Sequence, residues 1–536
     1  MIPRPRLWPI GHQQLRSLYT SHLARIPSGG PSKPPVWSPN PSAASLPRLS
    51  ASFRRDRKGA AKGQSATATR AADLSPTVGS APPAGVMTHM LETLLPDLAS
   101  GPILDTQHYR RLTAQDAAKE KRPPKGTQML VRDFVDDCLY NPHYGYFSKQ
   151  ASIYTAPTES FDIPAMRDSL EFMDRVADRY REMDDGGAPH SATSNRISRQ
   201  VWHTPTELFN PWFGNAIASY IVTEYKLHHY PEDDLIIYEM GAGNGTLMTN
   251  IMNYLRDFEP QVYERTRYNI IEISPQLAER QASHPALRAG AAHHRGVHFI
   301  NRSVLDWDTV VPQPCFFLAM EVLDNFAHDL IRYDPITERP YQGTVLTDPR
   351  GEYQEAFEAV HDPLIARYLR LRRQTGYVSP LFSRRARWFR HLRQHFPLPP
   401  NLTGPEFIPT RALQLLEVLR DYFPQHRLVV SDFYSLPDTV PGVDGPVVQT
   451  RYRETMVPCS TYLVQPGWFD IFFPTNFELL RDMYLQVCGR ATPDRHVRVR
   501  TQREFLEHYA DLEHTTTSSG ESPLLDYYEN NKFLLS

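Results

Sequence analysis

Three glycines at alternate positions join an apolar segment to a helical one, and they are the first residues of this chain that suggest chemistry. The segment Leu235–Thr246 reads LIIYEMGAGNGT, and Leu247–Phe258 continues it with helical spacing of apolar residues. A strand that ends in such a turn presents backbone N–H groups and a helix start, and Gly241, Gly243 and Gly245 would let a ligand approach the main chain closely. The pattern indicates a site for a nucleotide-type cofactor.

The spacing of the glycines favours one cofactor class. A dinucleotide fingerprint needs a third glycine three residues after the second, and that position here is Thr246. With Glu239 two residues before the first glycine, the string reads E-x-G-x-G-x-G-T, which resembles motif I of class I S-adenosylmethionine methyltransferases. The resemblance implies that S-adenosylmethionine binds against the turn residues Gly241, Ala242, Gly243, Gly245 and Thr246. The alternative is a tight turn that packs a strand against a helix and binds nothing.

Acidic residues stand near the ends of further apolar segments. Tyr268–Ser274 (YNIIEIS) contains Glu272, and SVLDW contains Asp306. A carboxylate can accept both hydroxyls of a ribose, so Glu272, with Ile273 beside it, is assigned to the adenosine part of the cofactor. Glu239 would lie near the ammonium group of the cofactor, directly or through water, and Asp306 near the adenine amino group. For each acid the alternative is a solvated or helix-capping carboxylate.

Strands and helices alternate through the middle of the chain. After the glycine segment, the apolar runs predict four more strands, at Tyr268–Ser274, Val297–Asn301, Cys315–Met320 and His426–Phe433. Helices are predicted at Pro275–Ser283 and Leu413–Tyr422. The alternation predicts an α/β fold, a Rossmann-like and mainly parallel doubly wound sheet with ligands at the carboxyl ends of its strands.

The rest of the chain divides around this predicted sheet. Helical spacing at Val131–Leu139 and Phe213–Tyr225 predicts an N-terminal helical cap, and Arg181–Gln200 has the polar composition of a surface insertion. About 90 residues, with a hairpin at Ile331–Tyr353, separate the fourth and fifth strands and form an insertion. The predicted parts are a leader and linker (1–89), the cap (90–230), the first half of the core (231–330), the insertion (331–424) and the second half of the core (425–536).

Several blocks in a fixed order resemble the MidA family of mitochondrial methyltransferases, the complex I assembly factor 7 type. The blocks are NPHYGYF at 141–147, TPTELFNPWFG at 204–214, YEMGAGNGTLMTNIM at 238–252, IIEISPQL at 270–277, AMEVLDNF at 319–326 and TQREFL at 501–506. The resemblance runs from about Val131 to the C-terminus. It implies a class I methyltransferase fold, S-adenosylmethionine as cofactor, and dimethylation of an arginine in a core subunit of respiratory complex I during its assembly.

The sequence departs from the family pattern mainly on the expected acceptor side. Met320 and Ala327 stand where the family has asparagine and proline, and an extra residue separates Glu207 from the following FG pair. The late block reads DIFFPTNF at 470–477 rather than being rich in Asp, Thr and His. A diverged paralogue with another acceptor, or a catalytically weak assembly or scaffold protein, is therefore an alternative.

Two carboxylates three residues apart are the candidates for acceptor chemistry. A guanidinium stays protonated at neutral pH and becomes a nucleophile only when it is positioned and relieved of a proton. Carboxylates can hold the guanidinium fork and accept that proton. Glu321 and Asp324, at the end of the predicted fourth strand, fit these needs, and Glu207 is a third candidate. The alternative for Asp324 is that it caps the next helix.

The composition bears on location and partners. The first 55 residues hold eight Lys and Arg and no Asp or Glu, with serines interleaved, which is typical of a mitochondrial transit peptide and predicts the matrix as destination. A disordered basic tail is the alternative. Beyond residue 90, 46 Lys and Arg stand against 58 Asp and Glu, which argues against nucleic acid as the main partner. The MidA resemblance implies a protein substrate instead.

Other features give weaker or negative signals. The four cysteines are far apart, so neither a disulfide framework nor a metal site is predicted. No apolar run is long enough to span a membrane. The segment Arg367–Arg393 holds nine arginines and no acid, with aromatic residues between them. An amphipathic helix with a solvated basic face is the favoured interpretation, and an RNA-binding surface of an RNA or small-molecule methyltransferase is the alternative.

Overall fold

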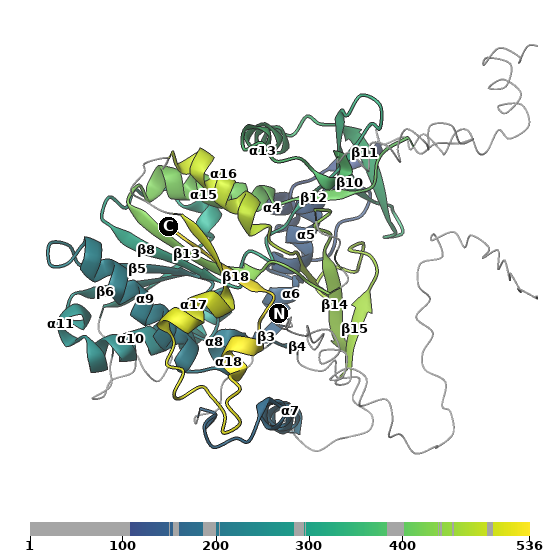
Figure 1. The fold of residues 1–536 in the computed structure, drawn as a ribbon. Coiled ribbons are helices and arrows are strands. Elements are labelled where there is room, and N and C mark those ends of the chain that lie inside the picture. The colour runs from purple at the N-terminus through teal and green to yellow at the C-terminus, as the bar shows by residue number, and fades with distance from the viewer. Residues whose placement is uncertain are drawn as a thin grey trace, which may run out of the picture. The chain divides into compact units, whose positions relative to one another are not determined.

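A seven-stranded sheet forms the centre of the chain, in the order β17-β18-β13-β8-β5-β6-β7 (Figure 1). Five neighbouring strands are parallel, and β18 runs antiparallel to its two neighbours. Their bounds are β5 Leu235–Met240, β6 Thr266–Glu272, β7 Val297–Asn301, β8 Cys315–Met320, β13 His426–Phe433, β17 Arg498–Thr501 and β18 Asn531–Leu535. The five strands predicted from apolar runs are the five parallel strands, and β5, β8 and β13 are buried along most of their length.

The computed structural model describes residues 108–149, 151–153, 160–185, 200–202, 204–282, 294, 296–382, 401–437, 439, 442–452, 455–489 and 497–536. The predicted transit peptide and linker, most of the polar insertion, and the arginine-rich residues after 382 lie outside these ranges. Within the described residues no helix combines the length and the apolar character that crossing a membrane requires.

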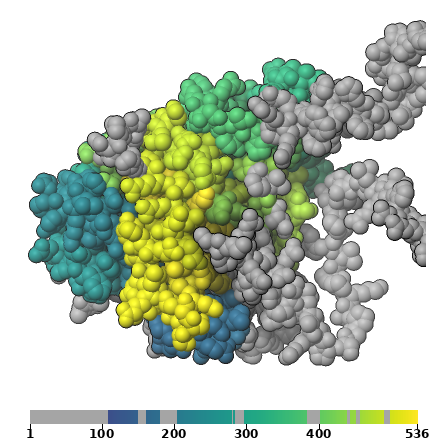
Figure 2. Space-filling model, in the orientation of Figure 1, coloured from purple at the N-terminus to yellow at the C-terminus, as the bar shows by residue number. Residues whose placement is uncertain are grey.

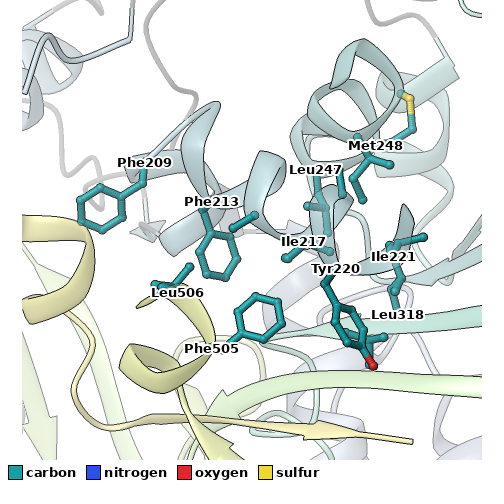
Figure 3. Close-up of a cluster of buried hydrophobic side chains, with 14 of the residues drawn as sticks. Phe209, Phe213, Ile217, Tyr220, Ile221, Leu247, Met248, Leu318, Phe505 and Leu506 are labelled. Atoms are coloured by element: carbon teal, nitrogen blue, oxygen red, sulfur yellow. The ribbon is translucent and has the colours of Figure 1, made fainter. Parts of the chain in front are cut away.

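Helices cover both faces of the sheet, as a doubly wound fold requires (Figure 1). One face carries α9 (Trp212–His228), α10 (Thr246–Phe258) and α17 (Gln502–Tyr509). In Figure 3 the α9 side chains Phe213 and Tyr220 lie between Leu247 of α10 and Phe505 of α17, and all four are buried. The other face carries α15 (Thr410–Tyr422) and α16 (Phe477–Cys488), packed on a second apolar cluster.

A second sheet joins the N-terminal part to the insertion after β8. Its order is β1-β2-β10-β9-β12, with β11 paired to β10. The strands are β1 Arg110–Arg111, β2 Thr127–Leu130, β9 Asp329–Tyr333, β10 Pro340–Thr347, β11 Tyr353–Ala359 and β12 Glu406–Ile408. The N-terminal part is thus not a purely helical cap, because β2 pairs with β10 across more than 200 residues. The signal was missed since β2 has only four residues and runs straight into α5 (Val131–Tyr140), the predicted helix.

A three-stranded sheet follows β13 in the chain. It has the order β15-β14-β16, with β14 at Val447–Tyr452, β15 at Thr455–Cys459 and β16 at Asp470–Phe472. The remaining elements are α4 Ala114–Ala117, α6 Tyr146–Lys149, β3 Ala151–Ile153, α7 Ser169–Asp185, β4 Gln200–Trp202, α8 Pro205–Leu208, α11 Pro260–Tyr263, α12 Pro275–Ala282, η4 Val304–Asp306, α13 Pro363–Gln374, η5 Pro380–Phe382 and α18 Pro523–Asp526. Figure 2 shows the C-terminal residues, in yellow, across the middle of the face between the teal core helices and the green insertion.

Candidate functional site

The glycine turn after β5 has the backbone that its sequence predicts. Gly241, Gly243 and Gly245 have φ values of 70°, 54° and 81°, in the left-handed region that favours glycine. The N–H of Gly241 donates to the carbonyl of Ile271 at the end of β6 (3.0 Å), and the N–H of Gly245 donates to the carbonyl of Ala242 (2.8 Å). Gly245 then begins α10. The turn is a compact cradle at the carboxyl end of β5.

Glu207 lies against this turn. It is buried in α8, and its Oε1 accepts hydrogen bonds from the Asn244 amide (3.1 Å) and the Thr246 hydroxyl (2.7 Å). The backbone N–H of Glu207 is capped by the hydroxyl of Thr204 (3.3 Å). These contacts connect Glu207 to the cofactor side of the site, whereas the sequence predicted an acceptor-side role.

Glu272 is buried at the end of β6 and is held by two donors. Its Oε1 accepts from the backbone N–H of Ser274 (2.9 Å), and its Oε2 accepts from the side-chain amide of Gln281 (3.0 Å). The same Gln281 nitrogen donates to the carbonyl of Gly243 (2.8 Å), so one amide joins Glu272 to the glycine turn. A carboxylate has about four lone-pair positions, so the side chain retains capacity for two hydroxyl groups.

The other cofactor-side candidates differ in exposure. Glu239 is buried, and its Oε2 accepts from the Tyr268 hydroxyl (2.8 Å). Burial, and then the nearby charge of Glu272, raise the pKa of Glu239 to about 7, although the tyrosine hydrogen bond opposes the shift. Ile273 is 50% exposed, an apolar surface beside Glu272. Asp306 is exposed in η4, and its backbone carbonyl accepts from Arg302.

The turn after β8 brings the acceptor-side candidates next to the glycine turn. Glu321 has φ of 52°, which is uncommon for a residue other than glycine, and its N–H donates to the carbonyl of Ser431 on β13 (2.8 Å). A Cβ on Gly241 would stand only 2.9 Å from Cγ2 of Val322, so the two turns are in contact. Asp324 is buried, three residues after Glu321.

Asp432, near the end of β13, holds the turn after β8 in place. Its Oδ2 accepts from the backbone N–H groups of Leu323 (2.8 Å) and Asp324 (3.1 Å), and its Oδ1 accepts from that of Phe433 (2.7 Å). The side chain is fully buried. Sequence reasoning missed this residue, although HRLVVSDF has an acid near its end, as Tyr268–Ser274 does with Glu272.

Asp470 and Tyr140 reach the same turn from β16 and α5. Asp470 Oδ1 accepts from the amide of Asn325 (3.0 Å), and the Tyr140 hydroxyl donates to the carbonyl of Asn325 (3.1 Å). The N–H of Phe473 donates to the carbonyl of Asp324 (2.8 Å). Asp470 opens the DIFFPTNF block, but nothing in the sequence pointed to Tyr140.

Four carboxyl groups therefore lie together, and we refer to Glu321, Asp324, Asp432 and Asp470 as the acid cluster. Burial raises the pKa of Asp324 to about 7. Burial and the charge of Asp324 raise that of Asp470 to about 8. Burial and neighbouring acids raise the pKa values of Glu321 and Asp432 well above the usual range. In the described ranges none of the four forms an ion pair, so the cluster is suited to a cation.

Clustered carboxylates can also ligate a metal ion. No group of three or more His, Cys, Asp or Glu side chains among the described residues is arranged to hold a metal.

The profile of a family described as putative S-adenosyl-L-methionine-dependent methyltransferases matches residues 216–495, more than half of the chain and all five parallel strands. The chain belongs to this family. The MidA resemblance, the cofactor S-adenosylmethionine and the methyltransferase class predicted from sequence are confirmed. The glycine turn, with no Cβ to fill its cradle, and Glu272, with lone pairs to spare, fit that cofactor.

Named relatives have the same class of function. A mitochondrial protein arginine methyltransferase NDUFAF7 homolog of Schizosaccharomyces pombe is 25% identical over 376 residues, which cover 67% of this chain and 76% of the relative. The homolog of Saccharomyces cerevisiae is 21% identical over 348 residues, which cover 60% of this chain and 77% of the relative. A solved COG1565 superfamily member and likely methyl transferase from Burkholderia thailandensis, bound to S-adenosyl-homocysteine, is similar with 15% identity and a TM-score of 0.49, covering 81% of this chain and 94% of that one.

Proposed function

We propose that this methyltransferase transfers methyl groups to an arginine side chain of a protein in mitochondria, in support of complex I assembly. The observation that carries the proposal is the acid cluster, which has no ion pair with any described residue and touches the glycine turn through Val322 and Gly241. A guanidinium is a planar cation with five N–H donors, and it matches carboxylates better than a neutral acceptor does.

On the cofactor side, we assign the ribose hydroxyls to Glu272, with the exposed Ile273 against the adenine. The turn residues Gly241, Ala242, Gly243, Gly245 and Thr246 face the methionyl part, and Glu239 lies near its ammonium group. Asp306, exposed after β7, is assigned to the adenine amino group. Glu207 supports the turn through Asn244 and Thr246, so we place it with the cofactor residues and no longer with the acceptor residues.

On the acceptor side, Glu321 and Asp324 bind the guanidinium and take up its proton. S-adenosylmethionine supplies an electrophilic methyl group when it is bound. Raised pKa values leave these acids partly protonated before an acceptor arrives, and a bound cation lowers those pKa values again. Acceptor binding should therefore release protons and leave carboxylates beside the guanidinium. Carboxylates positioned in this way can accept its proton as the new bond forms.

The location and target rest on the relatives and on the sequence. Both curated relatives carry the word mitochondrial and the words protein arginine methyltransferase in their names. The basic, acid-free leader agrees with import into the matrix. A core subunit of complex I is the proposed substrate because the MidA resemblance implies it.

The test is transfer of labelled methyl groups from S-adenosylmethionine by the full chain to matched peptides that differ only in one residue: arginine, lysine or citrulline. We expect label on the arginine peptide alone, because citrulline has the same shape and no charge. Glu321→Gln and Asp324→Asn should lower the turnover rate about 100-fold or more, the range for loss of an acid–base group, while cofactor affinity stays within about threefold. Glu338→Gln is the matched control, since Glu338 also has a positive φ (57°) but is exposed in a remote hairpin turn.

Other outcomes would point to the rival functions. Cofactor binding without transfer to any peptide or to complex I subunits, together with unchanged complex I assembly in cells that express Glu321→Gln, would favour a scaffold role. Transfer to RNA, lost at high salt, would favour a nucleic-acid substrate.

A further inference from the structure

We propose that Gln281 is a positioning residue for S-adenosylmethionine, because its side-chain amide joins the glycine turn to the carboxylate that we assign to the ribose. The proposal rests on that assignment of Glu272 but not on the identity of the methyl acceptor. Gln281 lies on α12, outside the glycine motif.

The geometry requires an amide NH₂ group at this position. Nε2 of Gln281 donates to the carbonyl oxygen of Gly243 (2.8 Å) and to Oε2 of Glu272 (3.0 Å). Both partners are acceptors, so a side chain that only accepts, such as glutamate, would be repelled by both. The aliphatic part of the side chain also fits the turn, since Cγ lies 4.0 Å from where a Cβ on Gly245 would stand. One side chain therefore fixes both halves of the cofactor site.

The carbonyl oxygen of the Gln281 side chain indicates that this residue does more than fill space. The side chain is fully buried, and Oε1 has no hydrogen-bond partner among the described residues. A buried carbonyl oxygen without a partner is destabilising, and an apolar residue would fill the space without that penalty. The cost of a glutamine at this position is explained if its hydrogen bonds to Gly243 and Glu272 strengthen the binding of the cofactor.

The same contact affects the charge of Glu272. Burial raises the pKa of this carboxyl group, and N–H donors from Ser274 and Gln281 oppose the rise. The other titratable groups that face it are Glu239 on β5 and Tyr140 on α5. Only the ionised carboxylate can accept two hydroxyls with both oxygens. Without Gln281 the pKa of Glu272 rises further. As the pH is lowered, Glu272 then takes up its proton at a higher pH, and the affinity for the cofactor should start to fall there.

The experiment is titration calorimetry of S-adenosylmethionine into the full chain at pH 6, 7, 8 and 9, comparing wild type with Gln281→Met. Methionine has a similar shape and donates no hydrogen bond. We expect about tenfold weaker binding at pH 7, or about 1.4 kcal/mol, with the deficit shrinking toward pH 9. Glu279→Gln, two residues earlier on the exposed face of α12, is the matched control and should bind like wild type. At saturating cofactor the variant should recover most of its turnover rate, so that the KM for the cofactor changes more than kcat.

An affinity equal to wild type at all four pH values would overturn the proposal, and so would a deficit that does not change with pH, because lost packing alone has no such dependence. If Gln281→Met does not fold, Gln281→Asn serves, since it keeps the amide but is one methylene too short to reach both acceptors, and the same expectations hold. Glu272→Gln separates the two levels of inference. Normal binding by Glu272→Gln would refute the assignment of the ribose, whereas weak binding by Glu272→Gln with normal binding by Gln281→Met would refute only the role of Gln281.

Discussion

Replacing Asp470 by asparagine should make the cofactor-free protein more stable at high pH. In the folded protein, burial and the nearby charge of Asp324 raise the pKa of Asp470 from 3.8 to about 8. The folded state therefore retains a proton that the unfolded chain has already lost between about pH 4 and pH 8. The contribution of Asp470 to the free energy of unfolding therefore falls as the pH rises through that window. Above pH 8 the full cost of burying the ionised carboxylate is present.

The size of the effect follows from the same values. At about 1.4 kcal/mol for each tenfold change in protonation, the interval from 3.8 to about 8 gives an upper limit of about 6 kcal/mol. The buried asparagine amide still costs free energy to desolvate, so we expect Asp470→Asn to gain about 2–4 kcal/mol at pH 9 and about zero at pH 4.5. The asparagine carbonyl can still accept the hydrogen bond from Asn325, which the aspartate accepts at 3.0 Å.

The assay is urea unfolding at pH 4.5 and pH 9, followed by tryptophan fluorescence. Asp482→Asn is the control, because Asp482 pairs with Arg481 (2.7 Å) on the partly exposed side of α16, and its loss should change stability by less than about 1 kcal/mol. The variant at 470 should also methylate an arginine peptide more slowly. The same stability change at both pH values, or destabilisation at pH 9, would show that the carboxylate is ionised and well compensated, and the electrostatic account of the acid cluster would be wrong.

Three further substitutions test other contacts in the site. Gly241→Ala would place a Cβ 2.9 Å from Val322 at a φ of 70°. It should destabilise the fold by about 1–2 kcal/mol and abolish cofactor binding in calorimetry. Unchanged binding would show that the turn adjusts freely. Glu207→Gln weakens the hydrogen bond that Glu207 accepts from Thr246, so steady-state kinetics should show a raised KM for the cofactor. A loss in kcat alone would instead indicate that Glu207 acts on the methyl acceptor. Tyr140→Phe removes the hydroxyl beside the acid cluster. It should raise the KM for an arginine peptide several-fold and leave the cofactor affinity unchanged. Equal losses in peptide KM and cofactor affinity would indicate a general structural role.

The five parallel strands of the central sheet could be predicted because each contains a run of apolar residues. The predicted bounds of β7, β8 and β13 match the structure, and β5 ends where the first glycine requires a turn. The last strand, β18, was not predicted, although it lies between β13 and β17 and its C-terminal half is fully apolar. Five residues are too short for periodicity to distinguish a strand from the end of a helix.

Most of the residues that we assign to the cofactor could be selected from the sequence, because they are local to one motif and the strand after it. The acceptor side was visible only in part, since Glu321 and Asp324 share a turn while Asp432 and Asp470 arrive from segments more than 100 residues away. A rule that selected every acid at a strand end would have found Asp432. Tyr140 had no such signal, because only the fold of the N-terminal part brings the end of α5 to this turn.

The members of the acid cluster differ in how many backbone hydrogen bonds they accept. Three backbone N–H groups converge on Asp432, which is more than any other member of the cluster accepts through the described contacts. Such donors stabilise a carboxylate, so Asp432 can hold the turn after β8 even though burial and Asp324 oppose its ionisation. Glu321 then keeps a left-handed backbone at a site where its neighbour Val322 contacts the glycine turn. Backbone N–H groups occupy Asp432. Under the proposed function, the groups left to bind a cationic acceptor are therefore Glu321 and the remaining oxygens of Asp324 and Asp470. Such a site would need more acids than those that touch the acceptor.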